Sequence, residues 1–164
     1  MSSSSTTNQL SRLVYASRAQ RLFSMDDFMV ILRKSRDNNQ RNGVTGVLAY
    51  GDCHFMQILE GSRRAVSQTY SRITQDARHT NVELIDFSGC SERYFADWSM
   101  QHQCVRQDIL SKIGIQSPFR PHNWTADRCI HFAIQYSVLL SNSAKDNEAT
   151  LQMVEASCNA ATIS

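Results

Sequence analysis

Alternating apolar and polar positions in the first half of the chain indicate short β-strands. Because successive strand side chains point to opposite faces, residues 13–17 predict a strand with Leu13, Tyr15 and Ser17 on one face. Four further strands are expected, at residues 44–50, 54–60, 81–87 and 93–100. Only three residues, GDC, separate the second strand from the third, which predicts a hairpin.

Apolar residues spaced three and four positions apart predict two helices between these strands. The first begins at Ser24, a candidate N-cap with Asp27 at the capping-box position, and ends at Gly43. The second covers about residues 62–77. The order βαββαββ predicts an α+β, ferredoxin-like sandwich, with two helices on one face of a mostly antiparallel sheet.

The chain changes character after Met100. A short helix is expected to end at Gly114, and residues 124–140 predict a longer helix that is apolar around more than half its circumference. Such a helix must cover the bare face of the sheet or a second copy of the chain. We therefore expect a disordered N-terminus (1–9), a main domain (10–103), C-terminal helices (104–141) and a flexible tail (142–164).

Composition narrows the class of protein. The 164 residues carry a net charge of +2, which gives no strong case for binding nucleic acid or an anionic membrane. No signal peptide or membrane-spanning run is expected. The five cysteines have neither CxxC pairs nor metal-ligand spacing, so we expect reduced thiols, no metal site and a cytoplasmic location.

Gln57 is the unexpected residue of the third strand. It lies between Phe55 and Leu59 on one face of a strand whose two faces are both largely apolar. A buried amide without partners costs about 1–3 kcal/mol. Gln57 is therefore satisfied by a partner, exposed to solvent, or present for a function.

The apolar stripe of the first helix also becomes polar, at Ser35, Asn38 and Asn39. Taken alone, the two asparagines suit a solvated last turn, and Tyr15 suits a core tyrosine. Together with Gln57 they could converge between sheet and helices, where amides and a phenol match a planar heterocycle. The sequence offers no nucleophile with a base, carboxylate pair or glycine-rich phosphate loop, which favours a small-ligand receptor over an enzyme.

Five blocks of sequence resemble the BLUF domains, which are flavin-binding sensors of blue light. They are YAS at 15–17, NN at 38–39, GVTG at 43–46, FMQILEG at 55–61 and RYFADWSM at 93–100. The likeness covers residues 10–103, and later segments resemble the short, stand-alone members that carry helices instead of an enzyme domain. It implies a photoreceptor for signal transduction that is not itself an enzyme.

The resemblance also implies a site. A flavin would lie between the two helices, with Gln57 between the Tyr15 hydroxyl and the flavin. Its pyrimidine edge would be met by Ser35, Asn38, Asn39, Arg72 and Asp76, the last two from the second helix. FAD is the family default, and FMN and riboflavin are alternatives.

In the implied mechanism, excited flavin takes an electron from Tyr15 while the proton passes through the Gln57 amide, which ends with changed hydrogen bonds. Trp98 and Met100, expected on one face of the last strand, would respond, although both could simply pack in the core. The C-terminal helices would then alter a homo-oligomer or the contact with an unidentified downstream protein.

Two other interpretations stay open at this point. One is a flavin-dependent redox enzyme using the same pocket, against which stands the lack of a nicotinamide-binding fingerprint. The other is a ferredoxin-like interaction domain without pigment.

Overall fold

The structure is a computed structural model that describes residues 8–21 and 24–142. Most of the expected disordered N-terminus (residues 1–7) and flexible tail (residues 143–164) lies outside the described residues. The strands are β1 (Leu10–Ala19), β2 (Thr45–Gly51), β3 (His54–Ser62), β4 (His79–Gly89) and β5 (Gln101–Cys104). The helices are α1 (Met25–Asn42), α2 (Arg63–Thr74), α3 (Gln107–Lys112), a 3-10 turn (Pro121–Asn123) and the C-terminal helix, described over residues 126–142.

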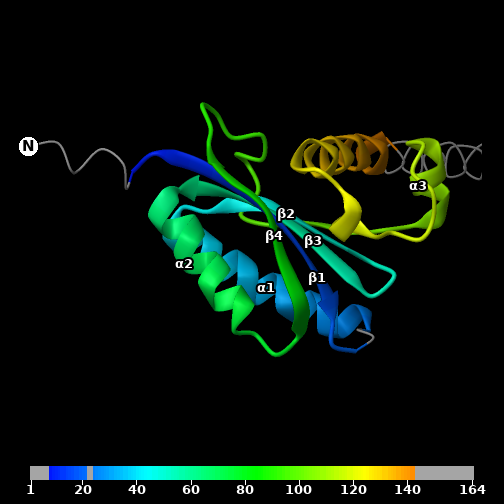
Figure 1. The fold of residues 1–164 in the computed structure, drawn as a ribbon, viewed down its shortest axis with the longest axis horizontal. Coiled ribbons are helices and arrows are strands. Elements are labelled where there is room, and N and C mark those ends of the chain that lie inside the picture. The colour runs from blue at the N-terminus through cyan, green and yellow to red at the C-terminus, as the bar shows by residue number, and fades with distance from the viewer. Residues whose placement is uncertain (1–7, 22–23, 143–164) are drawn as a thin grey trace, which may run out of the picture.

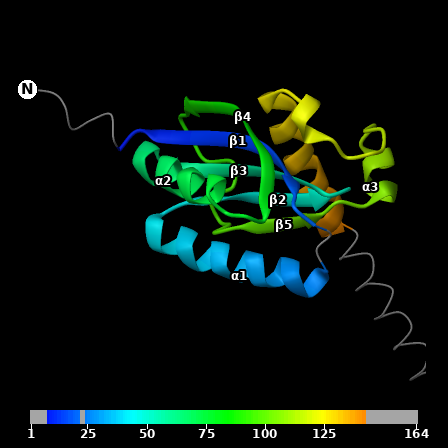
Figure 2. The same ribbon diagram turned by 60° about the horizontal axis from the view of Figure 1, so that its bottom comes forward.

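The five strands form one sheet in the order β4-β1-β3-β2-β5, which can be followed in Figure 2. All neighbours are antiparallel except β2 and β5, which are parallel. The predicted α+β sandwich with a mostly antiparallel sheet is confirmed. β3 lies at the centre, and its register places Gln57 directly opposite Tyr15 of β1.

Each face of the sheet is covered by its own layer of helices (Figure 1). α1 and α2 pack on one face, where Phe28 and Leu32 join Tyr15 and Leu59 in a buried core. The C-terminal helix lies across the other face, which is the first of the two alternatives expected for it. Its buried side chains Cys129, Phe132, Ala133 and Tyr136 share a core with Val14, Met56 and Ile58 of the sheet.

Local signals place α1 and the β2–β3 hairpin as expected. The Ser24 hydroxyl accepts from the Asp27 backbone N–H at 3.1 Å, and the Asp27 carboxylate accepts in return from the Ser24 N–H. Gly43 ends the helix in the left-handed conformation that glycine adopts most easily. Asp52 and Cys53 both have positive φ, as a two-residue hairpin turn of type I′ requires.

The prediction of a strand at residues 93–100 is wrong, because β5 begins only at Gln101. Trp98 and Met100 do not share a strand face either. Trp98 stacks on Phe95 with ring centroids 5.6 Å apart and packs against the core beneath the C-terminal helix. Met100 is buried in the core beneath α1 and α2. Between them the chain passes β2, where the Gly46 N–H donates to the Trp98 carbonyl at 2.9 Å.

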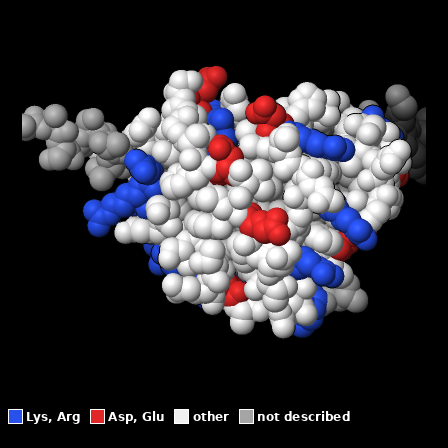
Figure 3. All heavy atoms as spheres, in the orientation of Figure 1, with Lys and Arg blue, Asp and Glu red and all other residues white. Residues whose placement is uncertain are grey.

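The described residues contain no helix with the length and hydropathy to span a bilayer, and no group of His, Cys, Asp and Glu arranged to bind a metal ion. Within the same ranges the cysteines are free thiols. On the face shown in Figure 3, basic and acidic side chains are interspersed among uncharged surface.

Candidate functional site

A cavity of about 210 Å³ opens between α1, α2 and β3. It is lined by Ile31, Lys34, Ser35, Asn38, Asn39, Gln57, Thr69, Arg72, Ile73, Asp76 and Arg78. The structure therefore brings together all the expected ligand-binding residues except Tyr15, which lies directly behind Gln57.

Gln57 is satisfied on its oxygen and only weakly on its nitrogen. The side chain is 3% exposed, and its Oε1 accepts a hydrogen bond from the Tyr15 hydroxyl at 2.5 Å. Its Nε2 donates to the Met100 sulfur at 3.4 Å, and a thioether is a poor acceptor. Because an amide nitrogen carries two N–H groups, Gln57 can also donate to a ligand in the cavity.

Tyr15 is completely buried (0% exposed) on β1. Its ring packs against Tyr70 of α2 at a centroid distance of 5.5 Å and meets the edge of His79 at 6.3 Å. Burial, followed by the nearby Tyr70 and Asp76, raises the pKa of the Tyr15 phenol far above its usual value. The hydroxyl therefore stays protonated and keeps its bond to Gln57.

The last turns of α1 hold the chain on either side of Met100. Asn39, which is buried, donates from Nδ2 to the Ser99 carbonyl at 2.9 Å. The Arg36 guanidinium donates to the Met100 carbonyl at 3.0 Å. This leaves the Oδ1 oxygen of Asn39 for a donor in the cavity, beside the half-buried Ser35 and Asn38.

Basic side chains outnumber acidic ones in the lining of the cavity. α2 ends at Thr74, so Asp76 lies in the following turn and not on the helix as expected. The Asp76 carboxylate accepts hydrogen bonds from the guanidinium and the backbone N–H of Arg78. These bonds lower the pKa of Asp76 to about 2. Asp76 is the one acidic group in the lining, against the three cations Lys34, Arg72 and Arg78.

His79 is a residue beside the site that sequence reasoning missed. It begins β4, with its Nδ1 2.7 Å from the Ser17 hydroxyl and its ring 4.7 Å from that of Phe55. Burial lowers the pKa of His79 to about 4. Its position depends on the pairing of β4 with β1, which is interrupted by two register shifts that alternation cannot reveal.

The lining suits a flat heterocycle that carries both donors and acceptors. The amides of Asn38, Asn39 and Gln57 offer N–H and C=O groups, and Ile31 and Ile73 supply apolar surface for a ring. These features fit the isoalloxazine ring of a flavin, whose pyrimidine part alternates carbonyl and N–H groups.

Comparison with known proteins points to the same ligand. The sequence model of the BLUF family, described as sensors of blue-light using FAD, matches residues 10–101, more than half of the chain. Photoactivated adenylate cyclase subunit beta of Euglena gracilis is 35% identical over 114 residues, which cover 64% of this chain and 13% of that protein. The blue light- and temperature-regulated antirepressor BluF of Escherichia coli (strain K12) is 32% identical over 100 residues, covering 57% and 24%. The chain thus spans a quarter or less of the length of these relatives.

Two solved structures share the fold. The BlsA ground state superposes with a TM-score of 0.69 at 30% identity, over 77% of this chain and 87% of BlsA. The dark state of BlrB, a BLUF protein, gives a TM-score of 0.60 at 34% identity, over 64% of this chain and 79% of BlrB.

Proposed function

The chain belongs to the BLUF family of flavin-using blue-light sensors, and we propose that light acts on it through Tyr15, Gln57 and Met100. One observation carries this proposal. Gln57 lines the cavity, accepts from the Tyr15 hydroxyl at 2.5 Å and donates to the Met100 sulfur. A single side chain thereby connects the ligand space to both a buried phenol and the residue that precedes β5.

A flavin ring would lie between α1 and α2, with Asn39 Oδ1 and the Asn38 amide at its pyrimidine edge. The cations Lys34, Arg72 and Arg78 favour a flavin that carries phosphate, FAD or FMN, over riboflavin. FAD is the ligand named in the family's description, and we propose it as the cofactor here.

A bound flavin supplies the absorption of blue light and, once excited, an oxidant. The chain's own part begins with the Tyr15 hydroxyl, which has a short path for its proton to Gln57 Oε1. An amide accepts at oxygen and donates from nitrogen, so rotation or tautomerisation of Gln57 reverses its hydrogen bonds. Rotation brings Oε1 to the place of Nε2 and so removes the donor from the Met100 sulfur, whereas tautomerisation leaves both atoms in place, makes Oε1 a donor and leaves Nε2 with a single N–H.

The output would then run from Met100 into β5 and the C-terminal helix. Gln103 of β5 donates from Nε2 to the Ala133 carbonyl and the Ser137 hydroxyl, both at 2.8 Å. The Ser137 hydroxyl also lies 2.9 Å from Gln101 Oε1. These bonds connect the residues immediately after Met100 to the helix that covers the sheet. We infer a sensor without enzymatic activity whose C-terminal helix changes an oligomer or a contact with a partner protein.

The decisive experiment is an absorption spectrum of the purified protein in the dark and just after blue light. We expect flavin bands that shift slightly to the red and return in darkness, and a Gln57→Leu variant that binds flavin without the shift. A full shift in Gln57→Leu would overturn the role of the amide. Reduction of the flavin by NADH in the dark would favour an enzyme, and protein that takes up no flavin would remove the sensor.

A further inference from the structure

Glu60 lies on the same strand as Gln57 but on the opposite face of the sheet, and its side chain is 0% exposed. We propose that Glu60 is a positioning residue: it fixes the β4–β5 connection (residues 90–100) and thereby holds Met100 against Gln57. This inference rests on the proposed role of Gln57 and assigns a function to the glutamate of the FMQILEG block.

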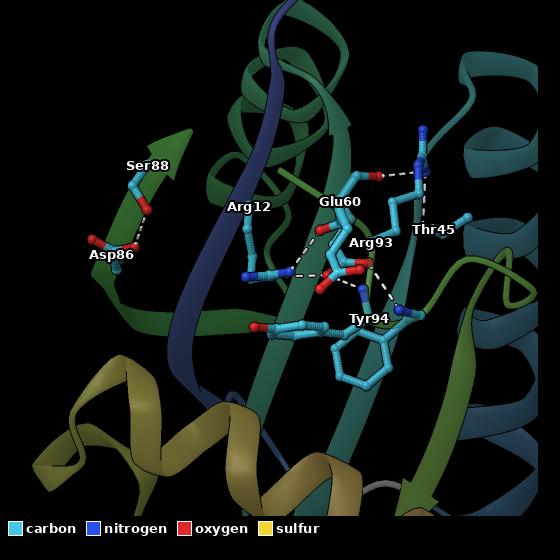
Figure 4. Close-up of polar contacts among 9 residues, drawn as sticks. Arg12, Thr45, Glu60, Asp86, Ser88, Arg93 and Tyr94 are labelled. Atoms are coloured by element: carbon cyan, nitrogen blue, oxygen red, sulfur yellow. Dashed lines mark hydrogen bonds and ion pairs between the residues drawn. The ribbon is translucent and has the colours of Figure 1, made fainter. Parts of the chain in front are cut away.

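Both oxygens of the Glu60 carboxylate are occupied (Figure 4). Oε1 accepts from Arg12 Nε at 2.8 Å and from the Tyr94 backbone N–H at 3.0 Å. Oε2 accepts from the Phe95 backbone N–H at 2.9 Å. Arg12 stands directly opposite Glu60 in the β1–β3 register, so the carboxylate joins two strands to two successive residues of the connection.

Two arginines extend this attachment. Arg93 donates to the Thr45 hydroxyl at 2.8 Å, to the Glu60 carbonyl at 3.0 Å and to the Gly43 carbonyl at 2.8 Å. Arg12 donates to the Glu92 carbonyl at 3.0 Å, and its guanidinium lies over the Tyr94 ring, 3.9 Å from the centroid. The first half of the connection is thus bound through side-chain and backbone groups together.

This arrangement does more than fill the core. Removing a carboxylate and a guanidinium from water is costly, and well-packed apolar residues of similar volume would serve stability as well or better. What an apolar pair could not provide is the two directed acceptors that hold the N–H groups of Tyr94 and Phe95. The geometry therefore specifies the backbone position at these residues.

The second half of the connection is held at the cavity. The Trp98 carbonyl accepts from Gly46, the Ser99 carbonyl from Asn39, and the Met100 carbonyl from Arg36. Gly46 lies so close to β3 that an added Cβ would stand 1.9 Å from the Ile58 carbonyl oxygen. β3 thus contacts both ends of the connection. Glu60 binds the backbone of Tyr94 and Phe95, and Gln57 donates to the side chain of Met100. When the hydrogen bond from Gln57 to Met100 is lost, the segment between Phe95 and Met100 moves, while Glu60 keeps the backbone of Tyr94 and Phe95 in place.

The test compares two variants that weaken the attachment of the connection, Glu60→Gln and Arg93→Gln (the clamp variants), with a matched control. In Glu60→Gln a single carboxamide oxygen replaces the two carboxylate oxygens that accept from Arg12, Tyr94 and Phe95. Arg93→Gln removes three hydrogen bonds and leaves no unpaired buried charge. Leu110→Ala, in the core under α3, supplies a loss of stability away from the connection. The measured quantities are hydrogen exchange of the Gly46 N–H in the purified protein kept in the dark, and the rate of dark recovery after blue light.

We expect both clamp variants to speed Gly46 exchange by about tenfold over Leu110→Ala at equal unfolding free energy, with exchange at Met56 unchanged. Dark recovery should change by about threefold or more while the size of the spectral shift is kept. Exchange equal to that of Leu110→Ala would reduce Glu60 to a structural residue. Faster exchange with unchanged recovery would overturn the link to Gln57.

Exchange is measured in the dark, so it decides the positioning role even if the wild-type protein shows no photoresponse. Should Glu60→Gln fail to fold, Arg93→Gln alone decides the outcome by the same two measurements.

Discussion

The hydroxyl of Tyr15 donates to the side-chain oxygen of Gln57 at 2.5 Å, from a position directly opposite it in the β1–β3 ladder. The two residues are therefore held by the central strands of the sheet and not by a loop. Tyr15→Phe removes this donor with almost no change in shape. We expect flavin to stay bound and the light-induced shift to disappear.

The same variant leaves a buried acceptor unpaired, so its free energy of unfolding should fall by about 1–3 kcal/mol in urea denaturation. Tyr70→Phe is the matched control, because the Tyr70 ring touches Tyr15 while the hydrogen bond to Gln57 belongs to Tyr15 alone. A Tyr15→Phe protein that retains the full shift would contradict the proposed proton path.

Met100 and Trp98 should respond differently to substitution because they pack on opposite faces of the sheet. Met100→Leu keeps the volume and removes the sulfur that accepts from Gln57, with an expected cost below about 1.5 kcal/mol. The spectral shift should persist, whereas light-induced change in hydrogen exchange of the C-terminal helix should weaken. Trp98→Phe should leave both responses closer to wild type, and equal effects of the two substitutions would refute the distinction.

His79 should make the protein less stable in mild acid. Burial lowers its folded pKa to about 4 from an ordinary 6.5. Between these values the unfolded chain binds more protons than the folded one, so the free energy of unfolding falls as pH falls from 6.5 to 4. The loss is on the order of 2 kcal/mol, below the full linkage value because the ring is partly exposed.

Denaturant unfolding at several pH values checks this prediction. The pKa values of His54 and His102 are also lowered by burial and act in the same direction, so the comparison is with His79→Gln, which should flatten the slope. An identical slope in wild type and His79→Gln would show that His79 titrates normally.

Gln103 should contribute less to stability than its contacts suggest. Its nitrogen makes two hydrogen bonds to the C-terminal helix, but its buried Oε1 has no hydrogen-bond partner within the described part of the chain. Gln103→Leu removes the bonds together with the unpaired acceptor, so the free energy of unfolding should change by less than about 1 kcal/mol. Ser137→Ala, which keeps Gln103 and removes one of its acceptors, should be the more destabilising, and the reverse order in urea titrations would disprove this account.

Local rules were sufficient for much of the fold and of the site. The limits of α1 follow from Ser24, Asp27 and Gly43, which act on their own helix ends. Alternation alone placed Gln57 on the same face as Phe55 and Leu59, which is the face that α1 and α2 cover. The polar end of the α1 stripe drew attention to Ser35, Asn38 and Asn39, which line the cavity, but their place at a ligand site was expected only from their combination with Gln57 and from the resemblance to the BLUF family.

The failures concern residues whose positions are decided from a distance. The alternation of residues 93–100 resembles a strand, but the N–H groups of Tyr94 and Phe95 are bound by Glu60, more than thirty positions earlier in the chain. His79 was missed because nothing near it in sequence shows that it will lie beside Tyr15. Both errors come from a partner on another strand.

The segment that matches the BLUF family model is shorter than the segment that forms the hydrophobic core. The match to the BLUF family model ends at residue 101, yet one apolar face of the sheet is covered mostly by side chains of later residues, among them Phe119, Phe132 and Tyr136. Asp52, at the tip of the hairpin that carries Gln57, also accepts from the Phe119 N–H at 2.7 Å. The part that folds as one unit is therefore longer than the part that the family model matches, and a fusion joined at residue 101 would remove the side chains of the C-terminal helix that share a core with Val14, Met56 and Ile58.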